Sequence, residues 1–140
     1  MGFLTVISET GMFHSATLFE IGSPRRMEWR GFHPQAHHSP IGAGEIDRSN
    51  REPYINHYAR FAVDDGILFQ ALQRADQGWS SAFYTIGVQD CVSLSADIAR
   101  WCGLSVPRMN MTPYGLIWAL TAYNTATHHD ARPYPWHMGG

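Results

Sequence analysis

The 140-residue chain contains no lysine, and its ten basic residues are all arginines. This absence excludes a Gly-rich phosphate-binding loop, because the glycine-rich segment 42–45 lacks both the required lysine and a following helix. Either a GC-rich genome or selection against lysine-directed tagging would account for the missing lysine. The formal net charge is −2, so the charge balance does not indicate a nucleic-acid partner.

Cysteines are few, and long apolar runs and a leader-like N-terminus are missing. The two cysteines, Cys91 and Cys102, do not make a disulfide framework. No apolar run reaches the roughly 18 residues of a membrane span. Residues 1–13 have no basic n-region and no long apolar h-region, so we predict no signal peptide. We expect synthesis in the cytoplasm with reduced thiols, and action outside the cell would require a dedicated secretion system.

Hydrophobic residues make up 44% of the chain and charged residues 16%, which is typical of one globular domain. β-rich runs predict strands at 3–8, 14–22, 26–32 and 56–63, with a short β segment within 81–87. Apolar periodicity and capping residues predict helices at about 65–77, 91–101 and 113–124. We predict a long loop at 33–56, a domain at 1–124 and a C-terminal tail at 125–140. The expected fold class is α+β.

Cys91 lies at the predicted start of the second helix, directly after Gln89 and Asp90. Unpaired N–H groups and the positive end of the helix dipole favour a thiolate there, and the same N–H groups can hold an oxyanion. Cys91 is therefore the candidate nucleophile, with Gln89 and Asp90 beside the site. The alternative is that Cys91 is simply a buried small side chain. Cys102 falls on the apolar stripe of the same helix and is predicted to be a core residue.

A nucleophilic cysteine needs a base, usually a histidine that a third polar group holds in place. His14 opens a predicted strand, which is a rigid mount for a base. On the next predicted strand, Glu28 is the candidate orienting group. Alternation also places Glu28 on the same face as Arg30, so an ion pair is the alternative for it. His33, just beyond, is the other candidate for the third position.

The segment HPQAHH offers a metal alternative, since His33, His37 and His38 could bind zinc together with a distant carboxylate. Its spacing matches no metalloenzyme motif, and a pair at i and i+4 indicates little without a helix beneath it. We therefore predict no metal and no cofactor.

The order of these features resembles the circularly permuted branch of the papain-like cysteine hydrolases, the NlpC-type group. The resemblance covers roughly residues 11–124. FHSATLFE is similar to the histidine strand, WRGFHP to the end of the next hairpin, and YTIGVQDCVSLSADIARWCGLSVP to the cysteine block, which has a Tyr before Asn or Asp, Cys and an apolar helix. The sequence departs from the pattern at Phe13, where glycine is frequent, and at Asp90, where asparagine is common. The resemblance implies an antiparallel sheet packed against the helix that carries Cys91.

The resemblance also implies an activity, namely cleavage of an amide bond through a Cys91–His14 acyl-enzyme mechanism. Because the group is rich in cell-wall amidases, it implies a peptide or peptidoglycan substrate. An interbacterial toxin with a cognate immunity protein as partner fits the missing signal peptide. One alternative is a lipid or ester hydrolase or acyltransferase on the same site, with Trp29, Trp79 and Trp136 meeting acyl chains. The other is a binding module whose catalytic site has decayed.

Overall fold

The computed structural model describes residues 1–9, 14–36, 39–49, 55–86, 89–108 and 111–129. Within these ranges the chain forms an α+β fold of seven strands and three helices. The strands are β1 (Gly2–Glu9), β2 (Ser15–Ile21), β3 (Arg26–Pro34), β4 (Ile41–Asp47), β5 (Ile55–Val63), β6 (Phe83–Thr85) and β7 (His128–His129). The helices are α1 (Asp65–Trp79), α2 (Cys91–Trp101) and α3 (Pro113–Tyr123).

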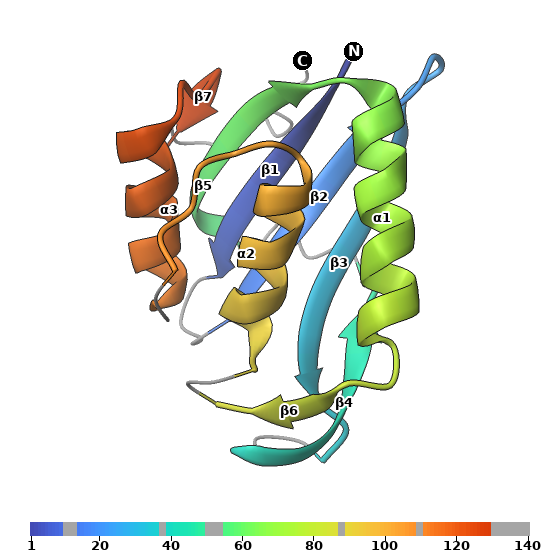
Figure 1. Ribbon diagram of the computed structural model, residues 1–140, viewed down its shortest axis with the longest axis vertical. Coiled ribbons are helices and arrows are strands. Elements are labelled where there is room, and N and C mark those ends of the chain that lie inside the picture. Colours follow the sequence, from blue (N-terminus) through green and yellow to red (C-terminus); the bar gives the residue numbers. More distant parts are fainter. Residues whose placement is uncertain (10–13, 37–38, 50–54, 87–88, 109–110, 130–140) are drawn as a thin grey trace.

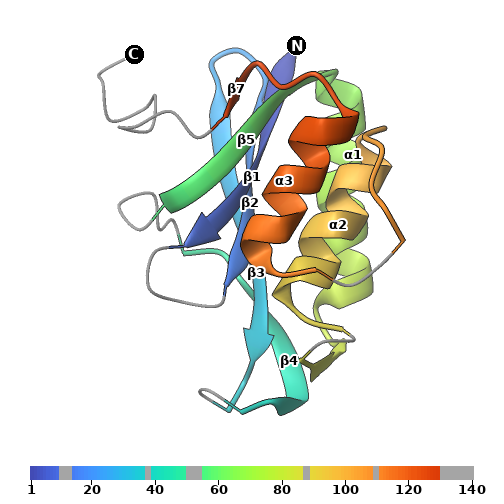
Figure 2. The same ribbon diagram turned by 90° about the vertical axis from the view of Figure 1, so that its left-hand side faces the viewer.

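The described strands form one antiparallel sheet with the order β6-β4-β3-β2-β1-β5-β7. Figure 1 shows the three helices side by side in front of the sheet, and Figure 2 shows all three on the same side of it. Helix α2 packs on β2 and β3, while α3 packs on β1 and β5. The first turn of α2 therefore lies over the first residues of β2.

Both faces of the central strands are buried. On the helix side, Leu4 and Val6 of β1 and Phe19 of β2 join the main core with apolar side chains of the helices. A second buried cluster lies on the opposite side, formed by Ile7, Ala16, Leu18, Trp29 and Tyr58. Burial on both faces is the reason that β1 and β2 are nearly continuous apolar runs in the sequence.

The predicted strands at 3–8, 14–22, 26–32 and 56–63, the short β segment and all three helices are confirmed, with ends that differ by a few residues. The predicted helix starts follow local capping chemistry. The side chains of Asp64, Asp90 and Thr112 each accept a backbone N–H at the start of a helix, and Pro113 opens α3. These starts depend on neighbouring residues alone, which is why the sequence predicts them.

The predicted loop at 33–56 is wrong where the structure describes it. β3 continues to Pro34, and Ile41–Asp47 form β4, which pairs with β3 and β6. Strand periodicity is weak because Gly44 is the only fully buried residue of β4. A side chain at Gly44 would overlap the Phe32 ring and meet the Ala82 carbonyl, so this glycine reflects close packing instead of a loop. Residues 37–38 and 50–54 lie outside the described ranges.

The sheet continues past the predicted domain end at residue 124. The Thr127 N–H donates to the Arg60 carbonyl at 2.7 Å, and β7 then pairs with β5. The remainder of the predicted tail, residues 130–140, lies outside the described part of the chain. None of the helices that the structure describes has the length and apolar character needed to cross a bilayer.

Candidate active site at the start of α2

Cys91 is the first residue of α2, and a reciprocal capping arrangement fixes its position. The Asp90 side chain accepts backbone N–H groups of the first turn, while the Ser93 hydroxyl accepts the backbone N–H of Asp90 at 3.1 Å. The backbone N–H of Ser15 is close enough to the Cys91 sulfur to lower the pKa of the thiol. One turn along α2, the Ser15 hydroxyl donates to the Ser95 hydroxyl at 2.8 Å. Two contacts from one strand residue therefore join the start of α2 to the start of β2.

Burial determines the acidity of Cys91. Only 1% of the residue is exposed, and burial raises the pKa of its thiol from 9.0 to about 12. The Ser15 N–H lowers this pKa, the charge of Asp90 raises it, and the N–H groups of Val92 and Cys91 lower it, but burial outweighs them. The N–H groups of the helix start favour a thiolate as expected, but burial opposes them with a larger effect. The thiol keeps its proton at neutral pH, so its attack on a carbonyl requires a base.

The two polar residues before Cys91 support the turn that carries it. The Gln89 side-chain amide donates to the Phe83 carbonyl at 2.6 Å, and its backbone exchanges two hydrogen bonds with Thr85. Asp90 is fully buried and uses its carboxylate as the cap of α2. Gln89 and Asp90 are thus next to the site as predicted, and the Gln89 amide is engaged with β6.

His14 directly precedes Ser15, whose hydroxyl bonds Ser95 of α2, so the backbone of His14 lies at the end of β2 that faces the first turns of α2. The imidazole is largely buried, and its Nε2 atom lies 3.2 Å from Oε2 of Glu9, the last residue of β1. The backbone N–H of Glu9 also donates to the His14 carbonyl at 3.1 Å. A fully buried carboxylate that the sequence analysis did not consider therefore accompanies the predicted base.

The thiol and the imidazole approach the 14–15 backbone from different sides. A Cβ atom at Gly31 would lie 3.1 Å from Nε2 of His14. The neighbours of Gly31 on β3, Arg30 and Phe32, point toward the helices, since Arg30 binds Asp76 of α1 and Phe32 belongs to the helix-side core. By alternation Gly31 faces the other side. Nε2 of His14 therefore points away from α2.

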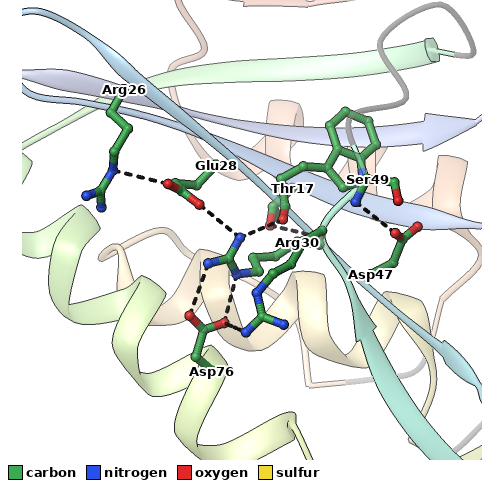
Figure 3. A network of polar contacts seen from close by, with 9 residues as sticks. Thr17, Arg26, Glu28, Arg30, Asp47, Ser49 and Asp76 are labelled. Carbon is green, nitrogen blue, oxygen red and sulfur yellow. Dashed lines mark hydrogen bonds and ion pairs between the residues drawn. The ribbon is translucent and has the colours of Figure 1, made fainter.

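Glu28 does not hold His14, and that prediction is corrected. Its carboxylate lies 3.2 Å from Arg26 and 3.2 Å from Arg30. Figure 3 shows this network, in which Arg30 donates two hydrogen bonds to Asp76 of α1 at 2.7 and 3.0 Å. The ion-pair alternative is correct for Glu28, because alternation places it with Arg30 on the helix side while Nε2 of His14 lies on the other side.

His33 is also held elsewhere. Its Nδ1 lies 2.9 Å from the Pro34 carbonyl oxygen, and its Nε2 lies 3.5 Å from the Glu45 carboxylate of β4. These contacts run along the β3–β4 pair. The residue that meets His14 is Glu9, because hairpin pairing joins the end of β1 to the start of β2.

Tyr84 of β6 is a site residue that the sequence analysis left without a role. Burial, followed by the charges of Cys91 and Asp90, raises the pKa of its phenol from 10.0 to about 12. The Tyr84 ring lies 5.6 Å from the Phe32 ring, centroid to centroid, in the helix-side core that also contains Cys91. The tyrosine in the resembled cysteine block was the signal that could have identified it.

The remaining predicted residues lie away from the Cys91 site or outside the described part of the chain. Cys102 is buried in the helix-side core, which confirms its structural role. Trp29 and Trp79 are buried as well, so they are not available to acyl chains, and Trp136 lies outside the described residues. Among the described residues, no three His, Cys, Asp or Glu side chains form a group that could hold a metal. His37 and His38 of the metal alternative lie outside those ranges.

Comparison with known proteins identifies no relative of this chain. The chain matches no protein-family model, no curated protein and no solved structure. Its chemistry must therefore be argued from the site, which holds a buried thiol at a helix start, a carboxylate-paired histidine one residue from the strand contact of that helix, and a phenol.

Proposed function

We propose that the protein is a cysteine hydrolase of the circularly permuted papain-like kind that cleaves an amide bond in a peptidoglycan peptide. The Cys91 sulfur attacks the carbonyl carbon while His14 takes the thiol proton. The C–N bond then breaks, His14 gives the proton to the leaving amine, and an acyl-enzyme remains. Water, deprotonated by His14, hydrolyses the thioester and restores the thiol.

One observation carries the proposal, namely that Ser15, the residue that follows His14, contacts the first turns of α2: its hydroxyl donates to Ser95, and its backbone N–H lowers the pKa of Cys91. A helix start supplies unpaired N–H groups, which stabilise the oxyanion formed when sulfur attacks. Because burial leaves the thiol protonated, the reaction depends on a base at this position. The peptide substrate rests on the resemblance of the three sequence segments to a group rich in cell-wall amidases.

A second candidate is a binding module without activity. The buried, protonated thiol favours it. In that case Cys91 is a core side chain like Cys102, and His14 serves only to pair with Glu9.

The deciding experiment incubates cell-wall sacculi and, separately, a phospholipid panel with the wild type and with Cys91→Ala, His14→Gln and Cys102→Ala. Products are identified by mass spectrometry. We expect new amide-cleavage products from sacculi with the wild type and Cys102→Ala, and none with the other two variants. Turnover by Cys91→Ala equal to that of the wild type would contradict the proposal, and products from phospholipids alone would move it to the lipid class.

Alkylation separates the active and inactive alternatives without a substrate. Burial raises the pKa of both thiols to about 12, so a difference in their reactivity must come from local groups. We expect iodoacetamide to modify Cys91 at least about tenfold faster than Cys102 at neutral pH, because the proposed base His14 would take the proton of Cys91 during the reaction, while Cys102 has no proposed base. Equal, slow modification of both would favour the binding module.

A further inference from the structure

Glu9 and His14 are joined twice across the β1–β2 connection. The Glu9 N–H donates to the His14 carbonyl at 3.1 Å, and the Glu9 carboxylate lies 3.2 Å from Nε2 of the imidazole. The Glu9 side chain is completely buried. A buried carboxylate is costly unless a cation or a donor accompanies it, so the imidazole and the carboxylate stabilise each other in this position.

Two features of the neighbouring strands determine where the pair lies. The β1–β5 register shifts between Ser8 and Glu9, which pair with His57 and Ile55, leaving Asn56 as an extra residue on β5. Such a bulge changes the direction of the side chains beside it. On the other flank, Gly31 leaves room for the ring, since a methyl group there would be 3.1 Å from Nε2. The imidazole therefore has a carboxylate on one side and bare backbone on another.

We propose that Glu9 is the positioning residue for His14. This inference rests on the proposed function. Nε2 lies 3.2 Å from the Glu9 carboxylate, a close polar contact and not a hydrogen bond in this structure. When the neutral ring carries its proton on Nε2, next to that carboxylate, its lone pair is on Nδ1, the nitrogen that can accept the Cys91 proton. When the proton moves from sulfur to Nδ1, the carboxylate stabilises the resulting imidazolium.

Other titratable groups of this region have contacts of their own, and His57 of β5, which pairs with Ser8, lies 3.9 Å from the Tyr114 ring, centroid to centroid. Asp90 caps α2 and raises the pKa of Cys91, and Tyr84 of β6 is coupled to both. His33, which follows on β3, is paired with Glu45. Glu9 is thus the carboxylate that the structure places against the imidazole itself.

The test compares Glu9→Gln with Glu28→Gln. Both variants replace a carboxylate by an amide of the same shape, but Glu28 pairs with arginines on the other side of the sheet. The readouts are the pH profile of Cys91 alkylation by iodoacetamide, and kcat and KM on the sacculus-derived peptide that the wild type cleaves. We expect Glu9→Gln to lower neutral-pH alkylation and kcat by about tenfold or more with KM little changed, and Glu28→Gln to change neither. Equal effects of the two variants would overturn the inference.

A measurement on the wild type covers the case in which Glu9→Gln does not fold. Nitrogen-15 NMR of the histidines, with His14 assigned by the spectrum of His14→Gln, reports which ring nitrogen carries the proton. We expect His14 to be the Nε2–H tautomer above its titration range, and an Nδ1–H tautomer would refute the proposal.

Failure of the inference and failure of the proposed hydrolase leave different results. If no substrate is cleaved, the tautomer and the alkylation profile still report on Glu9. If Glu9 has no role, turnover that depends on Cys91 and His14 remains intact.

Discussion

Raising the pH from about 7 to about 10 should destabilise the protein through its two buried thiols. Burial raises the pKa of both Cys91 and Cys102 from 9.0 to about 12. The unfolded chain therefore releases these protons near pH 9 while the folded protein retains them. Stability that is complete below pH 9 is lost as the pH rises toward the folded pKa, because the native state binds more protons in that interval.

The size of the loss follows from the same shifts. One pKa unit corresponds to about 1.4 kcal/mol. At about pH 10 the solution is one unit above the unfolded pKa and well below the folded pKa, so each thiol costs about 1.4 kcal/mol and the two together roughly 3 kcal/mol. Tyr84, whose pKa burial raises to about 12 from 10.0, adds to the loss at still higher pH.

Urea unfolding under reducing conditions at several pH values measures this effect. Wild type, Cys91→Ala, Cys102→Ala and the double variant are compared, and only the change in unfolding free energy with pH is used. The double variant gives the part of the pH dependence that does not come from the thiols, and this part is subtracted from the other curves. We then expect the unfolding free energy of each single variant to fall with pH about half as much as that of the wild type. A wild-type slope equal to that of the double variant would refute the desolvation argument. A slope that Cys91→Ala leaves unchanged would show that the pKa of Cys91 is the same in the folded and the unfolded protein, whereas a native thiolate paired with His14 would make the Cys91 contribution to stability increase as the pH rises toward about 9.

Two further predictions concern the fold and the cap. Gly44→Ala should cost on the order of 1–3 kcal/mol of unfolding free energy, because the new methyl group would overlap the Phe32 ring; Gly78→Ala, on an open helix surface, should be neutral or stabilising in the same denaturation assay. Asp90→Ser keeps a capping oxygen but removes the charge that raises the pKa of the adjacent thiol. Thiol titration by ultraviolet absorbance should therefore give a lower pKa, and an unchanged or higher value would contradict this assignment.

The sequence by itself determined the features that depend on neighbouring residues. Apolar runs located the central strands, and capping residues located the helix starts, including the one at which Asp90 precedes Cys91. It also identified Cys102 as core, because the apolar stripe of α2 follows from helical periodicity alone. Each of these predictions needed only residues within one or two turns.

Tertiary structure decided the features that depend on strand pairing and burial. The strand register brings Glu9 to His14 and keeps Glu28 away from it. No local sequence pattern predicts this arrangement, because the side of the sheet on which each side chain lies depends on strand pairing and on the bulge in β5. β4 exists because β3 and β6 pair with it. The acidity of Cys91 also depends on tertiary structure. The N–H groups of the helix start lower the pKa of the thiol, but burial, which is a property of the whole packed domain, raises it by more.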